Sequence, residues 1–227
     1  KRQLHSNASD NFYLQDSNSK TCYIVDLKTL LNSRKFVPDE QFRYSSEVLP
    51  TSDLCLLDDN RYIGYHMWYL DDKQFSKVDS PLGYYQKGED SGKGMDDFPF
   101  FVASVNGTRL FKNPQTQELW TADMHRDAIR IYNDSLKQIR ELVGPDHFSP
   151  EYTRRQIDAP VAFVTFADEC DYHAYTDYYI TDKHIYLVYE GNKHFDMKNL
   201  SPVEIFKLDF DGNLLCNYKP DRYVYSI

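Results

Sequence analysis

The segment Ile129-Arg-Ile-Tyr-Asn-Asp-Ser-Leu-Lys-Gln-Ile-Arg-Glu-Leu-Val143 decides between two folds for this chain. As strands, it is an apolar run, a polar bend at Asp134-Ser135 and a second apolar run. As a helix over residues 127–143, it would end at Gly144-Pro145 and line one face with Ile131, Leu136, Ile139, Leu142 and Val143. Both patterns fit the segment alone, so the choice depends on whether either recurs.

The strand–bend–strand pattern recurs along the chain. Its first strand ends in Asp or Asn at positions 26, 71, 133 and 209, which are 45, 62 and 76 residues apart. A four-stranded propeller blade needs on the order of 40–50 residues, so the surplus is expected in loops. The other members are Thr21–Asp26 with Leu27–Leu31, Tyr65–Asp71 with Gln74-Phe75, and Glu204–Asp209 with Asn213–Cys216. This recurrence favours strands at 129–143.

A second kind of hairpin alternates with the first. Polar turn residues separate two apolar runs at 53–57 and 61–65, at 101–105 and 108–111, and at 178–180 and 184–189. The middle pair is joined by Asn106-Gly107, which suits a type I′ turn with positive φ at both central positions. Nineteen Tyr and fourteen Phe also suit half-buried sheet surfaces.

These patterns predict an all-β protein, a β-propeller with blades of four antiparallel strands. Residues 1–227 are expected to form a single domain of about four to five blades. A β-sandwich with a helix at 127–143 is the alternative architecture.

Charge and hydropathy exclude several classes of protein. A formal net charge of −9 argues against nucleic-acid binding, which relies on clustered Lys and Arg. No apolar run is long enough to span a bilayer, so we expect no membrane-spanning segment. The four cysteines form no CxxC pair and are interpreted as small buried side chains, with one disulfide left open: Cys22, Cys55, Cys170 and Cys216.

The alternation of the two hairpins resembles the TolB-like six-bladed β-propeller proteins of Bacteroides-type bacteria. Ile129–Asp146, continuing to Tyr152, resembles that family's strand–turn–strand with a Gly-Pro-Asp connector. Tyr178–Gly191 is similar to the following inner hairpin, and Asp209–Asp221 to the outer one. The resemblance implies a propeller in the periplasm or cell envelope, with an outer-membrane lipoprotein anchored upstream of this chain as one form. It implies no particular reaction.

The ends of the chain also bear on this resemblance. Family members are longer, the chain opens Lys-Arg-Gln-Leu without Met, and Tyr223–Ile227 reads as the start of another strand. Two explanations stay open: the chain is a segment of a longer protein, truncated at both ends, or the ring closes in another way.

Two polar clusters are candidates for binding. His125-Arg126-Asp127 is expected to be a turn between strands near the mouth of a propeller channel, where loops carry binding residues. Asp168–His173 mixes hard carboxylates with softer Cys and His ligands, so a surface loop is a better interpretation than a metal site. We predict neither a metal nor a cofactor. The predicted ligand contacts are His125, Arg126, Asp127, Asp171, Tyr172 and His173.

The sequence carries no catalytic signature. It contains no Gly-x-Ser-x-Gly, and His125-Arg126-Asp127 lacks the other elements of a kinase site, so no catalytic residue is predicted. The favoured function is a non-enzymatic binding or scaffold protein of the bacterial cell envelope, with a protein or glycan bound at the channel mouth. The alternative is a propeller-type hydrolase or lyase, which needs several acids or histidines within hydrogen-bond reach.

Overall fold

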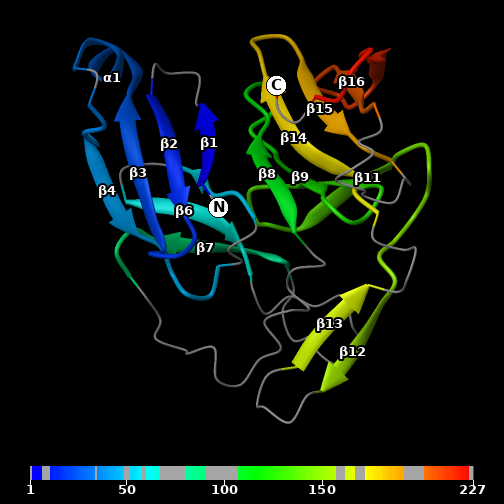
Figure 1. Ribbon diagram of the computed structural model, residues 1–227, viewed down its shortest axis with the longest axis horizontal. Coiled ribbons are helices and arrows are strands. Elements are labelled where there is room, and N and C mark those ends of the chain that lie inside the picture. Colours follow the sequence, from blue (N-terminus) through cyan, green and yellow to red (C-terminus); the bar gives the residue numbers. More distant parts are fainter. Residues whose placement is uncertain are drawn as a thin grey trace.

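The computed structural model describes residues 2–6, 11–33, 35–48, 52–57, 60–66, 80–89, 107–156, 162–166, 172–191, 202–224 and 227. Within these residues the chain forms three four-stranded antiparallel sheets, one three-stranded sheet and one two-stranded sheet (Figure 1). Neighbouring strands in every sheet are consecutive in the chain. The described part is therefore almost entirely β-structure, as the sequence predicts.

The strands follow one another as simple meanders. The first four-stranded sheet contains β1 (Arg2–Ser6), β2 (Asn11–Asp16), β3 (Thr21–Asp26) and β4 (Glu40–Arg43). The three-stranded sheet contains β5 (Cys55–Leu56), β6 (Arg61–Tyr65) and β7 (Leu82–Gln86). The second four-stranded sheet contains β8 (Thr108–Lys112), β9 (Leu119–Asp123), β10 (Ala128–Tyr132) and β11 (Gln138–Val143). β12 (Tyr152–Gln156) pairs with β13 (Ala162–Phe166), and the last sheet contains β14 (Tyr175–Ile180), β15 (Ile185–Tyr189), β16 (Glu204–Leu208) and β17 (Leu214–Tyr218).

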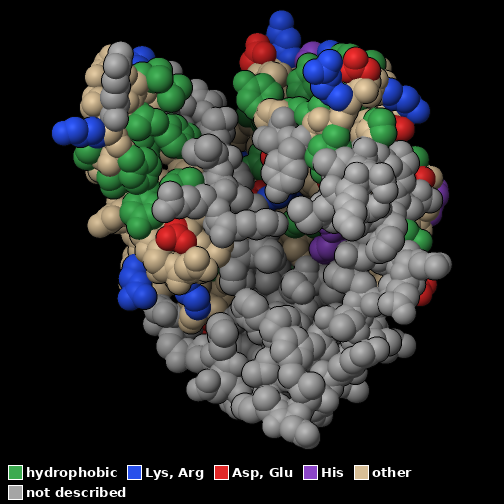
Figure 2. Space-filling view, in the orientation of Figure 1, with side chains coloured by type: hydrophobic (Ala, Val, Ile, Leu, Met, Phe, Trp, Pro, Cys, Tyr) green, Lys and Arg blue, Asp and Glu red, His purple; other side chains and the backbone are tan. Residues whose placement is uncertain are grey.

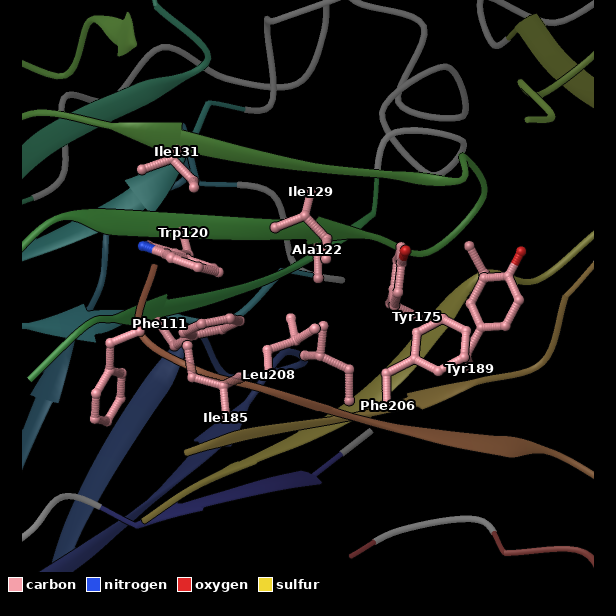
Figure 3. Close-up of a cluster of buried hydrophobic side chains, with 13 residues drawn as sticks. Phe111, Trp120, Ala122, Ile129, Ile131, Tyr175, Ile185, Tyr189, Phe206 and Leu208 are labelled. Carbon is pink, nitrogen blue, oxygen red and sulfur yellow. The ribbon is translucent and has the colours of Figure 1, made fainter. Parts of the chain in front are cut away.

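The hydrophobic core lies between successive sheets. Tyr13 and Phe42 of the first sheet pack with Tyr62 of the second. Residues of the three-stranded sheet pack with Leu110 and Leu119 of the next. A third cluster joins the sheet β8–β11 to the sheet β14–β17 (Figure 3), and it includes Phe111, Trp120, Ile131, Leu187 and Phe206. Each sheet is thus stacked on the next one along the chain.

The first strands of three sheets face one another. β8 contacts both β5 and β14. The guanidinium of Arg109 on β8 donates to the carbonyl oxygen of Thr176 on β14 at 2.7 Å, and it pairs with the carboxylate of Asp53, just before β5, at 3.3 Å. Figure 1 shows the sheets fanned around the middle of the molecule. Meander sheets stacked face to face, with their first strands inward, are the blades of a β-propeller.

Burial decreases from the inside of a blade to the outside. All five residues of β9 are buried, whereas every residue of β11 is exposed except the half-buried Leu142. β17, the last strand of its sheet, likewise has no buried residue. The outer strands are therefore solvated although they carry apolar residues, and Ile139, Val143, Leu214 and Leu215 are all more than half exposed.

The segment 129–143 is a hairpin, so the helix alternative at that position is wrong. β10 and β11 pair in antiparallel register around a turn in which Leu136 has a φ of 58°. The side-chain carbonyl of Asn133 accepts hydrogen bonds from the backbone N–H groups of Ser135 at 3.1 Å and Lys137 at 2.9 Å. An Asn that satisfies the turn in this way stabilises a bend where a helix would need continuous main-chain bonding.

Other predicted turns are also confirmed. β14 and β15 are joined through residues 181–184, and β16 and β17 through residues 209–213, where Gly212 has a φ of 85°. The carboxylate of Asp209 accepts the N–H groups of Asp211 and Asn213, so Asp209–Asn213 is a hairpin turn rather than a calcium loop. The expected bend after Asp71 and the strand 101–105 lie outside the described residues.

One predicted strand is a helix. Residues 27–31 were expected to pair with β3, but they belong to α1 (Leu27–Ser33), and β3 pairs with β4 instead. The carboxylate of Asp26 accepts the N–H of Thr29 at 2.6 Å, which is the hydrogen bond of a helix N-cap. This bond lowers the pKa of Asp26. The Leu-Lys-Thr-Leu-Leu that follows is a good helix-forming sequence.

Two of the cysteines are small buried side chains, as expected. Cys22 and Cys55 are buried free thiols, and burial raises their pKa values to about 12 and about 11. Cys216 is half-buried, and Cys170 lies outside the described residues. In the part of the chain that the structure describes, no helix is long and apolar enough to cross a membrane.

A half-buried histidine joins the first sheet to the second. His66 bridges to Val48 just after β4, and its Nδ1 hydrogen-bonds to the hydroxyl of Tyr85 on β7. A Cβ on Gly83 would lie 2.4 Å from the imidazole, so the ring occupies space that only a glycine leaves open. Burial lowers the pKa of His66, although Glu47 acts in the opposite direction.

The stability of the fold should therefore fall as His66 takes up a proton. A histidine whose pKa is lowered by folding contributes stability above its unfolded pKa, and that contribution is lost as the pH falls through the folded value. Between pH 7.5 and pH 5.5, urea unfolding should show a larger loss of stability for the wild type than for His66→Gln. Equal losses of stability in the two proteins would show that unfolding does not change the protonation of His66.

Candidate functional site

The connections between strands divide into two groups by edge. In the sheets β8–β11 and β14–β17, the short turns 113–118, 133–137, 181–184 and 209–213 join strands at one edge. Because alternate connections of an antiparallel meander lie at the same ends of the strands, the described connecting residues 124–127, 144–151, 172–174, 190–191 and 202–203 are at the other edge. We call this second edge the loop edge. The predicted ligand contacts that the structure describes belong to it: His125, Arg126, Asp127, Tyr172 and His173.

The structure brings two of the predicted segments together. The N–H of Ala174 donates to the carbonyl oxygen of Met124 at 2.7 Å, which holds the segment 172–174 against the turn 124–127. The rings of His125 and His173 lie edge to face, with their centroids 5.0 Å apart and an angle of 76° between the planes. Tyr172 packs against Phe148 with ring centroids 5.3 Å apart. Asp171 lies outside the described residues.

Both histidines make a polar contact through Nδ1, a hydrogen bond for His125 and a contact with a carboxylate for His173. The Nδ1 of His125 lies 3.1 Å from the carbonyl oxygen of Tyr172, and the Nδ1 of His173 lies 3.2 Å from a carboxylate oxygen of Glu190. A carbonyl or carboxylate oxygen only accepts, so each Nδ1 carries the proton.

Glu190 and Tyr223 complete this group and were missed by the sequence analysis. The N–H of Glu190 donates to the carbonyl oxygen of Ala174 at 2.9 Å, which sets the carboxylate beside His173. The hydroxyl of Tyr223 donates to the other carboxylate oxygen at 2.9 Å. The one available signal was an acidic residue directly after a strand and before Gly191, whose φ is 81°.

Asp127 lies beneath the surface of the site. It is 1% exposed, and one carboxylate oxygen accepts the N–H groups of Asp146 at 2.7 Å and His147 at 2.8 Å. The other oxygen accepts the hydroxyl of Tyr175 at 3.2 Å. Gly144 must be a glycine here, since a Cβ would lie 1.9 Å from the Asp127 carboxylate. Asp127 thus holds the loop after β11 against the turn 124–127.

Arg126 belongs to a charged network on the side facing the three-stranded sheet. Its guanidinium lies 3.4 Å from the carboxylate of Asp123, which also pairs with Arg130 at 2.7 Å. Arg130 in turn contacts Glu141 at 3.1 Å. Burial raises the pKa of Asp123, while Arg130 and Arg126 act to lower it. Arg126 is therefore anchored at its guanidinium, with its side chain half-buried at the loop edge.

The described residues offer no grouping of three or more His, Cys, Asp or Glu side chains that could hold a metal ion. Residues 168–171, which include most of the acidic cluster considered in the sequence, lie outside the described part. The group at the loop edge therefore consists of hydrogen-bonding side chains and aromatic rings: His125, Arg126, Phe148, Tyr172, His173, Glu190 and Tyr223.

No protein-family model matches the chain, and no curated protein matches it in sequence. Among solved structures, it is similar to a DUF4221-family protein from Bacteroides vulgatus, with a TM-score of 0.52 and 10% identity over 93% of this chain and 64% of that one. It also resembles a protein of unknown function from Bacteroides caccae, with a TM-score of 0.40 and 9% identity over 99% of this chain and 85% of that one. A third match is the WD40 domain of Pan2 from Neurospora crassa, with a TM-score of 0.39 and 10% identity over 99% and 67%.

Of these three, the first alone has a TM-score above 0.5, and this chain spans 64% of its length. At 10% identity the likeness concerns the fold and not the activity.

Replacing Asp127 should destabilise the loop edge. Asp127→Ala leaves two backbone N–H groups and the Tyr175 hydroxyl without their acceptor, and we expect a loss of about 3 kcal/mol in the free energy of unfolding. Urea unfolding measures this loss, and hydrogen exchange at the amides of residues 146 and 147 should speed up. Asp182→Ala, on the exposed turn at the opposite edge, is the control and should change stability little. Equal stability of the two variants would contradict the role assigned to Asp127.

Proposed function

We propose that this chain is a non-enzymatic binding or scaffold protein, built on TolB-like β-propeller blades, in the periplasm or cell envelope of a bacterium. Its ligand is a protein or a glycan that contacts the loop edge. The observation that carries the proposal is the convergence of His125, Tyr172 and His173 from two connections onto one surface. Loops positioned by a rigid scaffold are the usual seat of binding.

The chemistry of this surface supports recognition of a polar ligand that carries a flat or apolar face. The half-buried ring of Tyr172, backed by Phe148, offers a surface on which a sugar ring or an apolar side chain can stack. The histidine rings, held by Tyr172 and Glu190, supply hydrogen-bonding groups beside it. Because these orientations are fixed before a ligand arrives, little side-chain entropy is lost on binding.

The proposed envelope location follows from resemblance and not from the geometry of the loop edge. The resemblance of Ile129–Asp146 and the following hairpins to TolB-like propellers favours it. The fold likeness to a protein from Bacteroides vulgatus is in keeping with it. Detection of the chain in fractionated cells, by antibody against the envelope and cytosolic fractions, tests this part separately.

Binding should depend on the loop edge and not on the opposite edge. The double variant His125→Ala/Tyr172→Ala removes the stacking ring and one oriented imidazole. The control Asp182→Ala/Lys183→Ala alters the exposed turn between β14 and β15. Wild type and both variants are tested on an array of bacterial surface polysaccharides and, by cross-linking, against an envelope protein fraction.

Loss of about 1.4 kcal/mol or more, which is tenfold in affinity, is expected for the loop-edge variant, and no change for the control. Glycan binding and protein cross-links identify which ligand class applies. Binding that survives in both variants, or no binding of the wild type to either probe, would count against the proposal.

One observation favours a second candidate, a hydrolase or lyase. A carboxylate that orients an imidazole through Nδ1, as Glu190 does with His173, is also the arrangement of a general base. If the site is catalytic, the wild type should turn over chromogenic glycosides, or uronic-acid oligosaccharides that a lyase converts to unsaturated products. The rate should be about a hundredfold or more lower in His173→Ala. Turnover of the wild type at background level would leave binding as the function.

A further inference from the structure

The strand β17 forms an open edge of the last sheet. It pairs with β16 on one side, and among the residues that the structure describes no other backbone group bonds to it. Alternate residues of β17 therefore direct their N–H and C=O groups away from the sheet. Leu214 is 57% exposed, Leu215 51% and Tyr218 44%. Figure 2 shows hydrophobic side chains among charged ones at the surface over the strands that Figure 1 colours orange to red.

The outer strands of the other two four-stranded sheets carry charge where β17 does not. β4 contains Glu40 and Arg43, and the carbonyl oxygen of Arg43 already accepts the N–H of Gly88 at 2.9 Å. β11 contains Arg140 and Glu141 near its middle. Charged side chains on an edge strand oppose its pairing with another chain, because pairing takes them out of water. β17 reads Leu-Leu-Cys-Asn-Tyr and lacks this protection.

The strand is complementary to a second copy of itself. In the antiparallel register that overlaps all five residues of β17, Cys216 lies opposite the partner's Cys216. Leu214 then lies opposite the partner's Tyr218, and the two-fold axis repeats this pair. An aliphatic side chain beside an aromatic one on a neighbouring strand is a stabilising cross-strand pair. Within the strand no like charges meet, although each chain has a net charge of −9.

We propose that β17 is a dimer interface, at which two copies of the chain join their last sheets edge to edge through antiparallel strand pairing. The occupant is a strand because a row of N–H and C=O groups is matched by another strand and its backbone. A single short strand buries little surface, so the association is weak and depends on concentration. The paired strands run in opposite directions, so the loop edges of the two copies point away from each other and both remain accessible. The dimer is therefore bivalent for whatever binds at the loop edge.

Sedimentation velocity of the chain over a concentration series tests the proposal, and the wild type should pass from monomer to dimer. Leu214→Lys/Tyr218→Lys places lysines opposite lysines at both ends of the paired strands and should weaken dimerisation at least about tenfold. Leu214→Glu/Tyr218→Glu should be weakened in the same way. An equimolar mixture of the two variants should form a heterodimer, because each lysine then lies opposite a glutamate.

The matched control is Ile139→Lys/Val143→Lys on β11. Both positions are more than half exposed, so this variant adds the same charge on another outer strand and should dimerise as the wild type does. Circular dichroism checks that all variants are folded. A short bismaleimide should cross-link the wild type through Cys216 and should not cross-link Cys216→Ser.

Three outcomes would overturn the proposal. The first is a wild type that stays monomeric at every concentration. The second is a loss of dimer in the β11 control equal to that in the β17 variants, which would make the effect one of added charge alone. The third is a mixture of the lysine and glutamate variants that does not associate, because the pairing of Leu214 with the partner's Tyr218 would then be wrong.

Discussion

The structure depends on one constraint, which is that the inner strands are buried on both faces, as the fully buried β9 shows. On β9, Trp120 and Ala122 face the sheet β14–β17, while Leu119 faces the three-stranded sheet. A sheet with one solvated face can lie at the surface of a protein, but a sheet that buries both faces needs a neighbouring sheet on each side. Burying a side chain such as Leu119 or Ile131 contributes on the order of 1.5–3 kcal/mol, and this stabilisation is available only when the next sheet is in place. Stacking around an axis satisfies every sheet in turn.

The same constraint determines where polar chemistry can occur. With both faces of a sheet occupied by its neighbours, a polar side chain between sheets needs a buried partner, as Asp123 has in Arg130, and the remaining polar chemistry lies at the ends of the strands. At the edge with short turns, the backbone N–H groups of a turn bond to a side chain of the same turn. Asn133 and Asp209 are the acceptors in two of these turns. At the loop edge the connections are longer, so a buried group must hold them. The carboxylate of Asp127 does this for the loop after β11, since it accepts the N–H groups of Asp146 and His147.

Much of the candidate site could be predicted because it follows from the position of turns. The segment 125–127 was predicted as a turn beside an inner strand, and Tyr172 and His173 as part of a loop before a strand; both predictions place them at strand ends. Their mutual contact could not be predicted, because it depends on the hydrogen bond between Ala174 and Met124, which are 50 residues apart. Glu190 and Tyr223 were missed for the same reason. An isolated Glu after a strand has no distinguishing pattern until the sheet register sets it beside an imidazole.

The sequence alone determined the properties that depend on near neighbours in the chain. Alternating apolar residues, Asp- and Gly-centred bends and the recurrence of the two hairpins predicted the strands, most of the turns and the stacked blades. Only the tertiary structure decided that residues 27–33 form a helix while β3 pairs with β4, because a strand needs a partner and β4 supplies it. It also decided that Asp127 points inward while His125 lies at the surface, since loops distant in sequence provide the donors for that carboxylate. Local patterns are set by adjacent residues, whereas burial and pairing are set by which sheets come to lie against each other.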